Sequence, residues 1–590
     1  MATPKPLKDA GASAPASMAG LKRYLPFLDW LFHYRRQDLV GDVMAGIIVT
    51  IMLVPQSMAY ALLAGLPPQV GLYASIVPLI IYGLLGTSRT LAVGPVAIMS
   101  LLTAAAIGQL AETGSPDYVT LALILALLLG GLQILMGLFR VGFLVNFLSH
   151  PVLSGFTSAA AIVIGTSQLK HIMGISIPST ESVFELLRYA FEHAAESNVL
   201  VLGIGLGSVA ILFYFKDALG GQLKRLGLAD ALIVPITRGG PLVLVILGTV
   251  LVWGLQLDQI AGVKVVGSIP AGLPPLTVPT FDWARWQALF PTAITLAFVG
   301  FMESISVAKS LASKRRQKVD ADQELLALGA ANVGAAFTGG YPVTGGFSRS
   351  VVNFTAGANT GLASMITAGL IALTVIFLTP IFYFLPQAVL AAIVIVAVST
   401  LVDLKTPRHV WHYNKADAAA WLITFVAVLA VGVETGIIVG VIATVVLYLW
   451  RTSRPHIAIV GQVGTTETYR NVLRHEVKTC PHVVAVRVDA SLYFANTKYL
   501  EDTLLRVIAE RPDVKHLLLI GSAINFIDFS ALETLESLRQ ELRDAGVQLH
   551  LAEIKGPVMD RLKTSGFIER IGLNRVYLST HEAMKSLACV

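Results

Sequence analysis

The chain has 590 residues, of which 55% are hydrophobic and only 14% are charged. A soluble globular domain carries about 25% charged residues, so this composition excludes an ordinary soluble protein. The net charge is +6, but no basic patch with interleaved aromatic residues accompanies it, and we expect no nucleic-acid partner. The sequence also has no nucleophile–base pattern, metal-ligand cluster or phosphate loop, which argues against an enzyme, a cofactor and a bound metal.

Both ends of the chain differ from its apolar middle. Residues 1–38 start with a stretch rich in Ala, Pro and Ser that lacks the apolar core of a signal peptide, so we expect a cytoplasmic N-terminal segment. The two cysteines, Cys480 and Cys589, lie in the C-terminal tail. Two widely spaced thiols predict neither a disulfide framework nor a metal site, and they agree with a reducing compartment.

Two sets of seven apolar stretches fill most of residues 39–452, which we expect to form a transmembrane domain. A helix needs about 20 residues to cross the hydrocarbon core, so some stretches are too short to cross alone. The first set lies at about 40–64, 70–87, 95–111, 118–138, 147–169, 198–215 and 241–256. The second set lies at about 288–311, 323–338, 343–357, 361–378, 381–400, 416–432 and 435–450.

Basic residues are concentrated in alternate loops between these stretches. With the N-terminus in the cytoplasm, clusters such as the one at 314–316 fall inside. This bias predicts an even number of crossings with both termini in the cytoplasm, and an odd number in each half inverts one half relative to the other. The outside loops then hold only Lys170, Arg188, Lys264 and Arg285.

The third stretch of each half is interrupted at a matching place, by Val-Gly-Pro at 93–95 and by Gly-Tyr-Pro at 340–342. Such interruptions in inverted halves indicate a transport site, although Gly and Pro are also simply common in membrane helices. Because proline suits the first turn of a helix, we expect two half-helix N-termini at mid-membrane, each acting as about half a positive charge. Small neighbours would let an anion approach the backbone there: Gly94, Val96, Ala97, Thr344, Gly345 and Gly346.

Two ionisable residues interrupt apolar stretches of the second half. Arg349 follows the second interruption, and Glu303 lies in an earlier stretch. A charge inside the membrane is costly unless it is paired or hydrated. One interpretation is a structural Glu303–Arg349 ion pair; the other is that Arg349 attracts an anion while Glu303 exchanges a proton. Gln56 and Tyr60, four residues apart on one helical face, suit either anion binding or helix–helix contact.

Residues 453–590 alternate between strand and helix patterns and predict a small cytosolic α/β domain. Strands are expected at 483–488, 516–520 and 548–552. Helices are expected near 497–510, 529–544 and 557–565.

Several motifs resemble the sulfate permease (SulP) family: Gln-Ser-Met-Ala-Tyr at 56–60, Pro-Gln-Val-Gly-Leu-Tyr at 68–73, Gly-Pro at 94–95 and Phe-Ser-Arg-Ser at 347–350. The resemblance covers nearly the whole chain, including a tail similar to STAS domains. It implies an α-helical, seven-plus-seven inverted-repeat fold with core and gate domains, a homodimer, and elevator-like movement of the core. It also implies an anion site made by the two half-helix starts with Gln56, Tyr60, Glu303, Ser348 and Arg349.

Two positions bear on coupling and regulation. Sodium-coupled bicarbonate members of the family carry a hydroxyl residue where this chain has Val307, so a sodium site is not expected and a proton at Glu303 fits better. Ser530 aligns with the phosphoacceptor serine of STAS proteins, in which Gly usually follows instead of Ala531. Regulatory phosphorylation of Ser530 and a purely structural helix start capped by Asp528 are the alternatives.

Together these observations predict proton-coupled uptake of sulfate or a related oxyanion across a bacterial inner membrane. The alternatives are transport of bicarbonate, chloride or a dicarboxylate, a nucleobase permease of the same fold, and a non-transporting scaffold whose tail recruits a cytosolic protein. Arg349 argues against a nucleobase permease because a neutral ring does not need an arginine. The buried charges argue against a scaffold because an inert bundle would not retain them.

Overall fold

The computed structural model describes residues 25–143, 149–177, 182–227 and 230–589. The chain divides into two compact units, with the boundary between Thr444 and Val445 inside the helix α23 (Val433–Thr452). We call the first unit the membrane unit and the second the tail. Most of the expected N-terminal segment, residues 1–24, lies outside the described residues.

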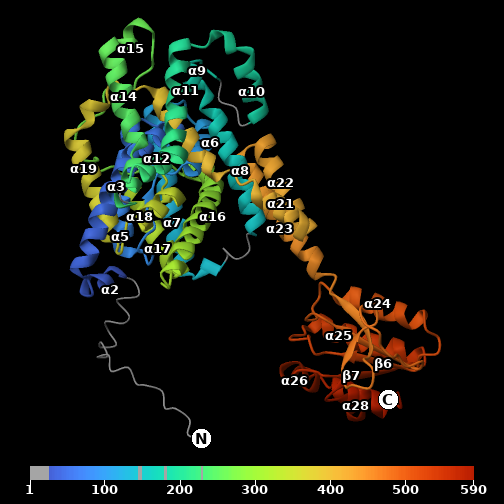
Figure 1. Cartoon of the computed structure of the whole chain (residues 1–590). Helices are drawn as coiled ribbons and strands as arrows, with labels where there is room; N and C mark the ends of the chain where they lie inside the picture. Colours follow the sequence, from blue (N-terminus) through green and yellow to red (C-terminus); the bar gives the residue numbers. More distant parts are fainter. Residues whose placement is uncertain (1–24, 144–148, 178–181, 228–229, 590) are drawn as a thin grey trace. The chain divides into compact units, whose positions relative to one another are not determined.

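The helices before the tail correspond to the expected apolar stretches in both halves (Figure 1). In the first half they are α3 (Arg36–Leu63), α4 (Pro68–Tyr73) with α5 (Val77–Leu85), α6 (Ala97–Gly108), α7 (Pro116–Leu138), α8 (His150–Ser167), α11 (Val199–Phe213) and α14 (Gly240–Leu255). In the second half they are α16 (Trp283–Lys314), α17 (Ala321–Phe337), α18 (Phe347–Thr355), α19 (Leu362–Phe377), α20 (Gln387–Val398), α22 (Lys415–Val431) and α23.

Shorter helices that the apolar pattern did not predict connect these elements. They are α2 (Phe27–Phe32), α9 (Leu169–Met173), α10 (Val183–Glu192), α12 (Leu219–Arg225), α13 (Asp230–Arg238), α15 (Leu257–Ile260), the 3-10 turn η5 (Ser399–Leu401) and α21 (Lys405–Tyr413). Helix α10 is amphipathic and carries charged residues, so a search for apolar stretches passes over it.

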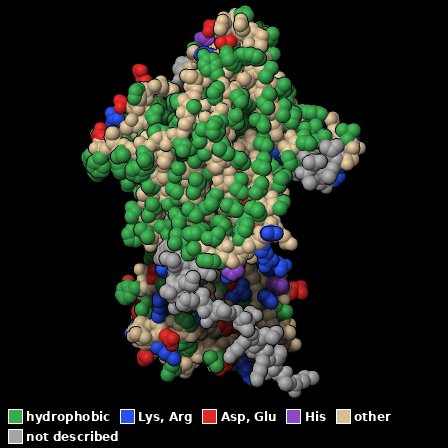
Figure 2. All heavy atoms as spheres, turned by 90° about the vertical axis from the view of Figure 1, so that its left-hand side faces the viewer, with side chains coloured by type: hydrophobic (Ala, Val, Ile, Leu, Met, Phe, Trp, Pro, Cys, Tyr) green, Lys and Arg blue, Asp and Glu red, His purple; other side chains and the backbone are tan. Residues whose placement is uncertain are grey.

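Eight helical stretches of the described chain are long and apolar enough to cross a membrane, and α6, α14 and α19 are shorter apolar helices. Figure 2 shows hydrophobic side chains over the middle of one face of the membrane unit. On α14, for example, Leu247, Val250 and Trp253 are all exposed. An apolar surface of this extent on the outside of a protein indicates contact with lipid.

Polar caps fix where several membrane helices begin. Asp320 accepts hydrogen bonds from the backbone N–H groups of Asp322 and Gln323 at the start of α17. Asp282 and Asn414 cap α16 and α22 in the same way. Each cap provides an acceptor for donors that the first turn of a helix leaves unpaired.

The tail is a six-stranded sheet with helices packed on it. The strand order is β4 (Tyr469–Asn471), β3 (Ile457–Gln462), β5 (Val483–Val488), β6 (His516–Ile520), β7 (Gln548–Ala552) and β8 (Val576–Tyr577). Strand β3 pairs antiparallel with β4 and β5, and the strands from β5 to β8 are parallel. The helices are α24 (Thr497–Ala509), α25 (Phe529–Asp544), α26 (Gly556–Thr564), α27 (Phe567–Ile571) and α28 (Thr580–Ser586).

The strands β5, β6 and β7 and the helices α24 to α26 were predicted, whereas β3, β4, β8, α27 and α28 were not. Strands β4 and β8 have three and two residues, which is too short for a pattern of alternation to appear. The central strands are buried on both faces, so they read as continuous apolar runs.

The expectation of two unpaired cysteines is wrong, because a disulfide joins Cys480 and Cys589. Cys480 precedes β5 and Cys589 follows α28, and both side chains pack against the same small cluster with Val483 and Met584. The fold of the tail brings together two thiols that are 109 residues apart in the sequence.

Candidate functional site

Two short strands cross at the centre of the membrane unit and set the geometry of the site. Strand β1 (Val93–Gly94) pairs antiparallel with β2 (Thr344–Gly345), with Val93 opposite Gly345 and Gly94 opposite Thr344. Helix α6 follows β1 and α18 follows β2, and no side chain caps either helix. The first N–H groups of both helices are therefore left without capping acceptors, and each helix end carries partial positive charge.

The structure corrects the predicted positions of the two prolines. Pro95 lies before the N-cap residue of α6 and Pro342 lies five residues before α18, so neither occupies the first turn of a half-helix. The N-cap residues of the two helices are Val96 and Gly346, so Gly94 corresponds to Thr344, and the match between the halves shifts by three residues. The extended backbone of the crossing, and not the proline, decides where each helix begins.

Arg349 is the third residue of α18 and lies in its first turn, whereas a half-helix that began at Pro342 would place it about two turns in, and its side chain reaches back to the crossing. Its side chain is buried, and its Nη1 donates a hydrogen bond of 2.5 Å to the carbonyl oxygen of Pro95. Its Nε and Nη2 have no hydrogen-bond partner. An arginine presents five donors in a planar fork, so the unfilled side of this fork is free to bind an acceptor.

Two glycines make room for this arginine. A Cβ on Gly346 would lie 2.9 Å from Nη2 and 3.0 Å from Cζ of Arg349. Gly94 has a φ of +152° and a Cβ there would lie 3.4 Å from Nη2 of the same guanidinium. Gly346 is favoured because a side chain would crowd the guanidinium, and Gly94 is favoured because of its backbone conformation as well.

Glu303 faces the same space from α16, but it does not form the ion pair that was one of our two interpretations. No salt bridge joins Glu303 to Arg349 among the described residues, and Oε2 of Glu303 has no hydrogen-bond partner. An ion pair that only locked two helices together would use these atoms. Instead, the carboxylate and the guanidinium each keep unfilled hydrogen-bonding capacity.

A cavity of about 40 Å³ lies between these groups. Most of the expected site residues line it. The exceptions include Gly94 and Gly345, which lie in the crossing strands. The expected residues that line the cavity are Gln56, Tyr60, Val96, Ala97, Glu303, Gly346, Ser348 and Arg349. The structure therefore brings together, from α3, α16 and the two half-helix starts, residues that are up to about 290 positions apart.

The sequence did not predict one wall of this cavity. The C-terminal end of α20 and the turn η5 supply it through Ala397, Val398, Thr400 and Leu401. These residues carry no charge, glycine or proline, so no local signal marks them. The packing of α20 against α3, α8 and α11 places them at the site.

A network of hydroxyl groups holds the crossing in place. Ser304 Oγ accepts a hydrogen bond of 2.8 Å from the backbone N–H of Gly345 and lies 2.7 Å from Thr344 Oγ1. Thr344 Oγ1 in turn donates to the carbonyl oxygen of Gly300. These bonds tie β2 to α16, which also carries Glu303, so the carboxylate and the half-helix start keep a fixed spacing.

A second cavity, of about 90 Å³, adjoins the first. Both are lined by Gln56, Ser348, Ala397 and Thr400. The second cavity also touches two basic residues, Lys216 and Arg238, which the charge bias assigns to the inside. The central cavity therefore shares part of its lining with a cavity that touches basic residues.

Two other buried carboxylates of the membrane unit are fully used in hydrogen bonds. Asp42 accepts from the backbone N–H groups of Asn359 and Thr360 and from the Thr360 hydroxyl. Glu324 accepts from Tyr82 and from the N–H and hydroxyl of Thr87. Both join an element of one half to a loop of the other, and we assign them a structural role.

In the tail, Asp528 caps α25 through a hydrogen bond of 2.8 Å from the N–H of Ala531, which agrees with the structural interpretation of this segment. Phosphorylation of Ser530, in the first turn of α25, stays a prediction. The described residues contain one group of metal-ligand composition, Cys480, His482 and Cys589, in which the disulfide occupies both sulfur atoms.

Comparisons with known proteins agree with this geometry. A model of the sulfate permease family matches residues 39–424, and a model of the STAS domain matches residues 474–583. "Sulfate transporter 4.1, chloroplastic" of Arabidopsis thaliana is 38% identical over 573 residues, which cover 95% of this chain and 82% of that protein. "High affinity sulfate transporter 2" of Stylosanthes hamata is 31% identical, with 96% and 86% covered.

A solved structure matches over nearly the whole length. The murine Slc26a9 anion transporter in the inward-facing state has a TM-score of 0.88 at 26% identity, with 99% of this chain and 97% of that chain covered. This match confirms the predicted helical transmembrane fold with a C-terminal STAS domain, and the relatives are transporters and not enzymes. The chain belongs to the sulfate permease family and is a multi-pass membrane protein that transports anions.

Proposed function

We propose that the protein takes up sulfate or a related oxyanion together with a proton. The observation that carries this proposal is the position of Arg349, which has two unpartnered nitrogens and lines a cavity at two uncapped helix starts. The guanidinium and the two helix starts then supply positive charge from three sources around one small space. The printed names of the relatives, which are sulfate transporters, support sulfate among the small anions.

Glu303 supplies the proposed coupling to protons. Its Oε2 lacks a partner and it lines the same cavity as Arg349. A negative carboxylate beside a dianion is repulsive, so uptake of a proton by Glu303 favours binding of the anion. Loss of the proton on the other side of the membrane then favours release, which couples the two movements without direct contact between proton and anion.

The two walls of the cavity support an elevator-like mechanism. The crossing and α18 supply one part of its lining, and the end of α20 with η5 supplies another. In the proposed movement, the crossing carries the anion past α20 and η5. The adjoining cavity at Lys216 and Arg238 then offers a basic route toward the cytoplasm.

The remaining parts of the proposal concern the setting of the protein. We place it as a homodimer in a bacterial inner membrane, with both termini in the cytoplasm and a cytosolic protein partner at the tail. The loop charges support this orientation. Accessibility of a tag at each terminus in intact cells, and the mass of the purified protein in detergent, are the measurements that check orientation and dimer.

Uptake of radiolabelled sulfate into liposomes that contain the purified protein tests the function. We expect an inward proton gradient to increase the initial rate in the wild type. In Glu303→Gln, which keeps the size of the side chain but cannot titrate, uptake should no longer respond to the gradient. Unchanged gradient-driven uptake in this variant would show that Glu303 does not couple the proton.

Competition in the same assay tests the substrate. Unlabelled sulfate and related oxyanions should reduce uptake of labelled sulfate at lower concentrations than bicarbonate, chloride or dicarboxylates do. Stronger competition by one of these other anions would identify it as the preferred substrate and overturn sulfate.

A further inference from the structure

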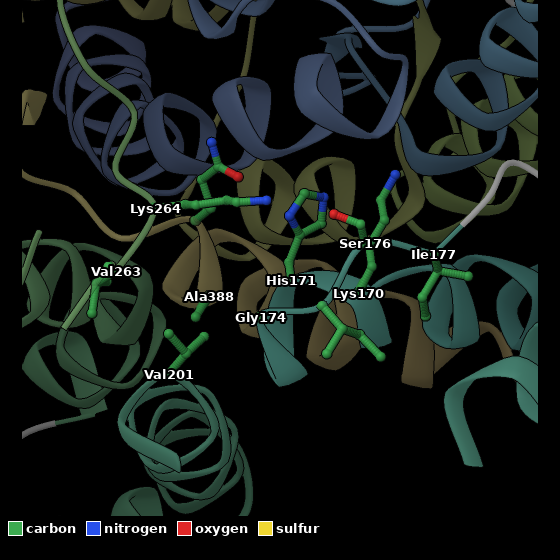
Figure 3. Close-up of a pocket in the computed structure, with 12 residues that line it drawn as sticks. Lys170, His171, Gly174, Ser176, Ile177, Val201, Val263, Lys264 and Ala388 are labelled. Carbon is green, nitrogen blue, oxygen red and sulfur yellow. The ribbon is translucent and has the colours of Figure 1, made fainter. Parts of the chain in front are cut away.

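A third cavity of the membrane unit, of about 250 Å³, lies away from the central site (Figure 3). We call it the basic pocket and define it by Lys170, His171, Ser176, Lys264 and Gln387 among the residues that line it. Helix α9 provides Lys170 and His171, the loop after α15 provides Lys264, and α20 begins with Gln387.

One helix connects the basic pocket with the central site. Gln387 and Ala388, at the start of α20, line the basic pocket, whereas Ala397 and Val398, at its end, line the central cavity. Ten residues of α-helix span about 15 Å. The two cavities therefore lie at opposite ends of α20, and the basic pocket is on the side opposite Thr400 and the inner basic residues.

The basic residues of the outside loops have two different uses. Arg188 pairs with Glu192 at 3.0 Å, and Arg285 pairs with Asp117 at 3.1 Å. Lys170 and Lys264 instead meet in the basic pocket, and within the described chain neither of them forms a salt bridge. The side of the protein with the fewest basic residues thus places its two unpaired lysines in one cavity.

The other polar groups of the basic pocket are suited to the same kind of ligand. Figure 3 shows the Lys264 side chain extending across the pocket toward the His171 ring, with Ser176 beside that ring. The imidazole, the Ser176 hydroxyl and the Gln387 amide can all donate to an oxyanion. None of the described residues that line the pocket is acidic, so two ammonium groups share a cavity without a counter-charge.

We propose that the basic pocket is a collecting site for hydrated oxyanions, sulfate among them, before they reach the central site. The inference rests on the proposed function for the direction of transport. Both lysines are exposed, so they bind a hydrated anion weakly and exchange it rapidly. Their effect is to concentrate anions at one end of α20 and to raise the rate of association, as charged clefts generally do.

The dependence of uptake on sulfate concentration and salt tests this proposal. At low ionic strength, the double variant Lys170→Gln/Lys264→Gln should raise the KM for sulfate by about 5- to 20-fold while the maximal rate stays the same, and about 0.5 M salt should remove most of the difference. Arg188→Gln removes an outside charge that is already paired, and it should behave like the wild type. Equal KM values and equal salt dependence in the double variant and Arg188→Gln would overturn the proposal.

Direct binding separates this site from the central one. In detergent, the full-length Arg349→Ala variant should retain weak binding of radiolabelled sulfate, and adding Lys170→Gln and Lys264→Gln should abolish it. Absence of millimolar sulfate binding to Arg349→Ala would overturn the basic pocket. If the wild type transports no sulfate but Arg349→Ala still binds it, the proposed function is refuted and the proposal for the basic pocket remains.

Discussion

The membrane unit contains two kinds of buried charge. Asp42 and Glu324 are fully buried, and N–H and hydroxyl donors surround them. Arg349 is equally buried, but two of its nitrogens lack partners, and Glu303 beside the same cavity has an unfilled oxygen. A fully bonded charge contributes to the stability of the fold, whereas a buried charge with unfilled bonds has capacity left for a ligand. The difference in hydrogen bonding thus separates the carboxylates that stabilise the fold from the two charges for which we propose a role in transport.

The sharpest test of this comparison removes the charge of Arg349. Arg349→Gln should reduce the initial rate of anion uptake by about 10- to 100-fold, because a charge-assisted interaction with the anion is worth about 1.5–3 kcal/mol. The melting temperature in detergent should change little, since few bonds within the protein are lost. A large fall in melting temperature would show that Arg349 mainly stabilises the fold, as Asp42 and Glu324 do.

The opposite pattern is expected for Glu324. Glu324→Ala leaves the Tyr82 hydroxyl and the N–H groups of Thr87 and Ser88 without their acceptor. The expected loss of stability is about 3–5 kcal/mol, because buried donors without partners are costly. Thermal unfolding in detergent measures it, with the exposed Glu112→Ala as control. Normal stability of Glu324→Ala would contradict the assignment of fully bonded carboxylates to structure.

His550 extends the comparison to the tail. Burial, together with the charges of His516 and Arg575, lowers its pKa to about 4, and its Nδ1 has no partner. The unfolded chain, with a histidine pKa near 6.5, binds the proton between about pH 6.5 and 4 while the folded tail does not, so stability falls as pH falls through this window. Between pH 7.5 and 5 the loss is about 2 kcal/mol.

Limited proteolysis of the tail in the full-length protein measures this effect. The wild-type tail should be cleaved faster at pH 5 than at pH 7.5, and His550→Gln should remove most of the difference. The exposed His475→Gln serves as control and should keep it. If His550→Gln retains the full pH dependence, another group is responsible.

The membrane helices were predictable because hydropathy is averaged over many residues, and local errors cancel. The expected stretch at 95–111, for example, became α6 at Ala97–Gly108. The charged site residues were also predictable, since Arg349 and Glu303 stand out in apolar surroundings. Their failure to pair was not, because that depends on distances across the fold.

What the sequence could not predict depends on contacts between distant segments. The match between the two halves was off by three residues because prolines dominate the local pattern, whereas the pairing of Gly94 with Thr344 sets the true register. Asp42 and Glu324 escaped notice because their partners lie in the other half of the chain. The Cys480–Cys589 disulfide was missed for the same reason.

The crossing of β1 and β2 has a consequence for how the protein is made. Val93 and Gly94 emerge during synthesis long before Thr344 and Gly345, their only strand partners in the described chain. The backbone groups of β1 have no strand partner until the second half is made, and unpaired backbone groups are costly where water is scarce. The proposed anion site is therefore completed late in assembly, because the first half alone lacks Arg349 and the second helix start.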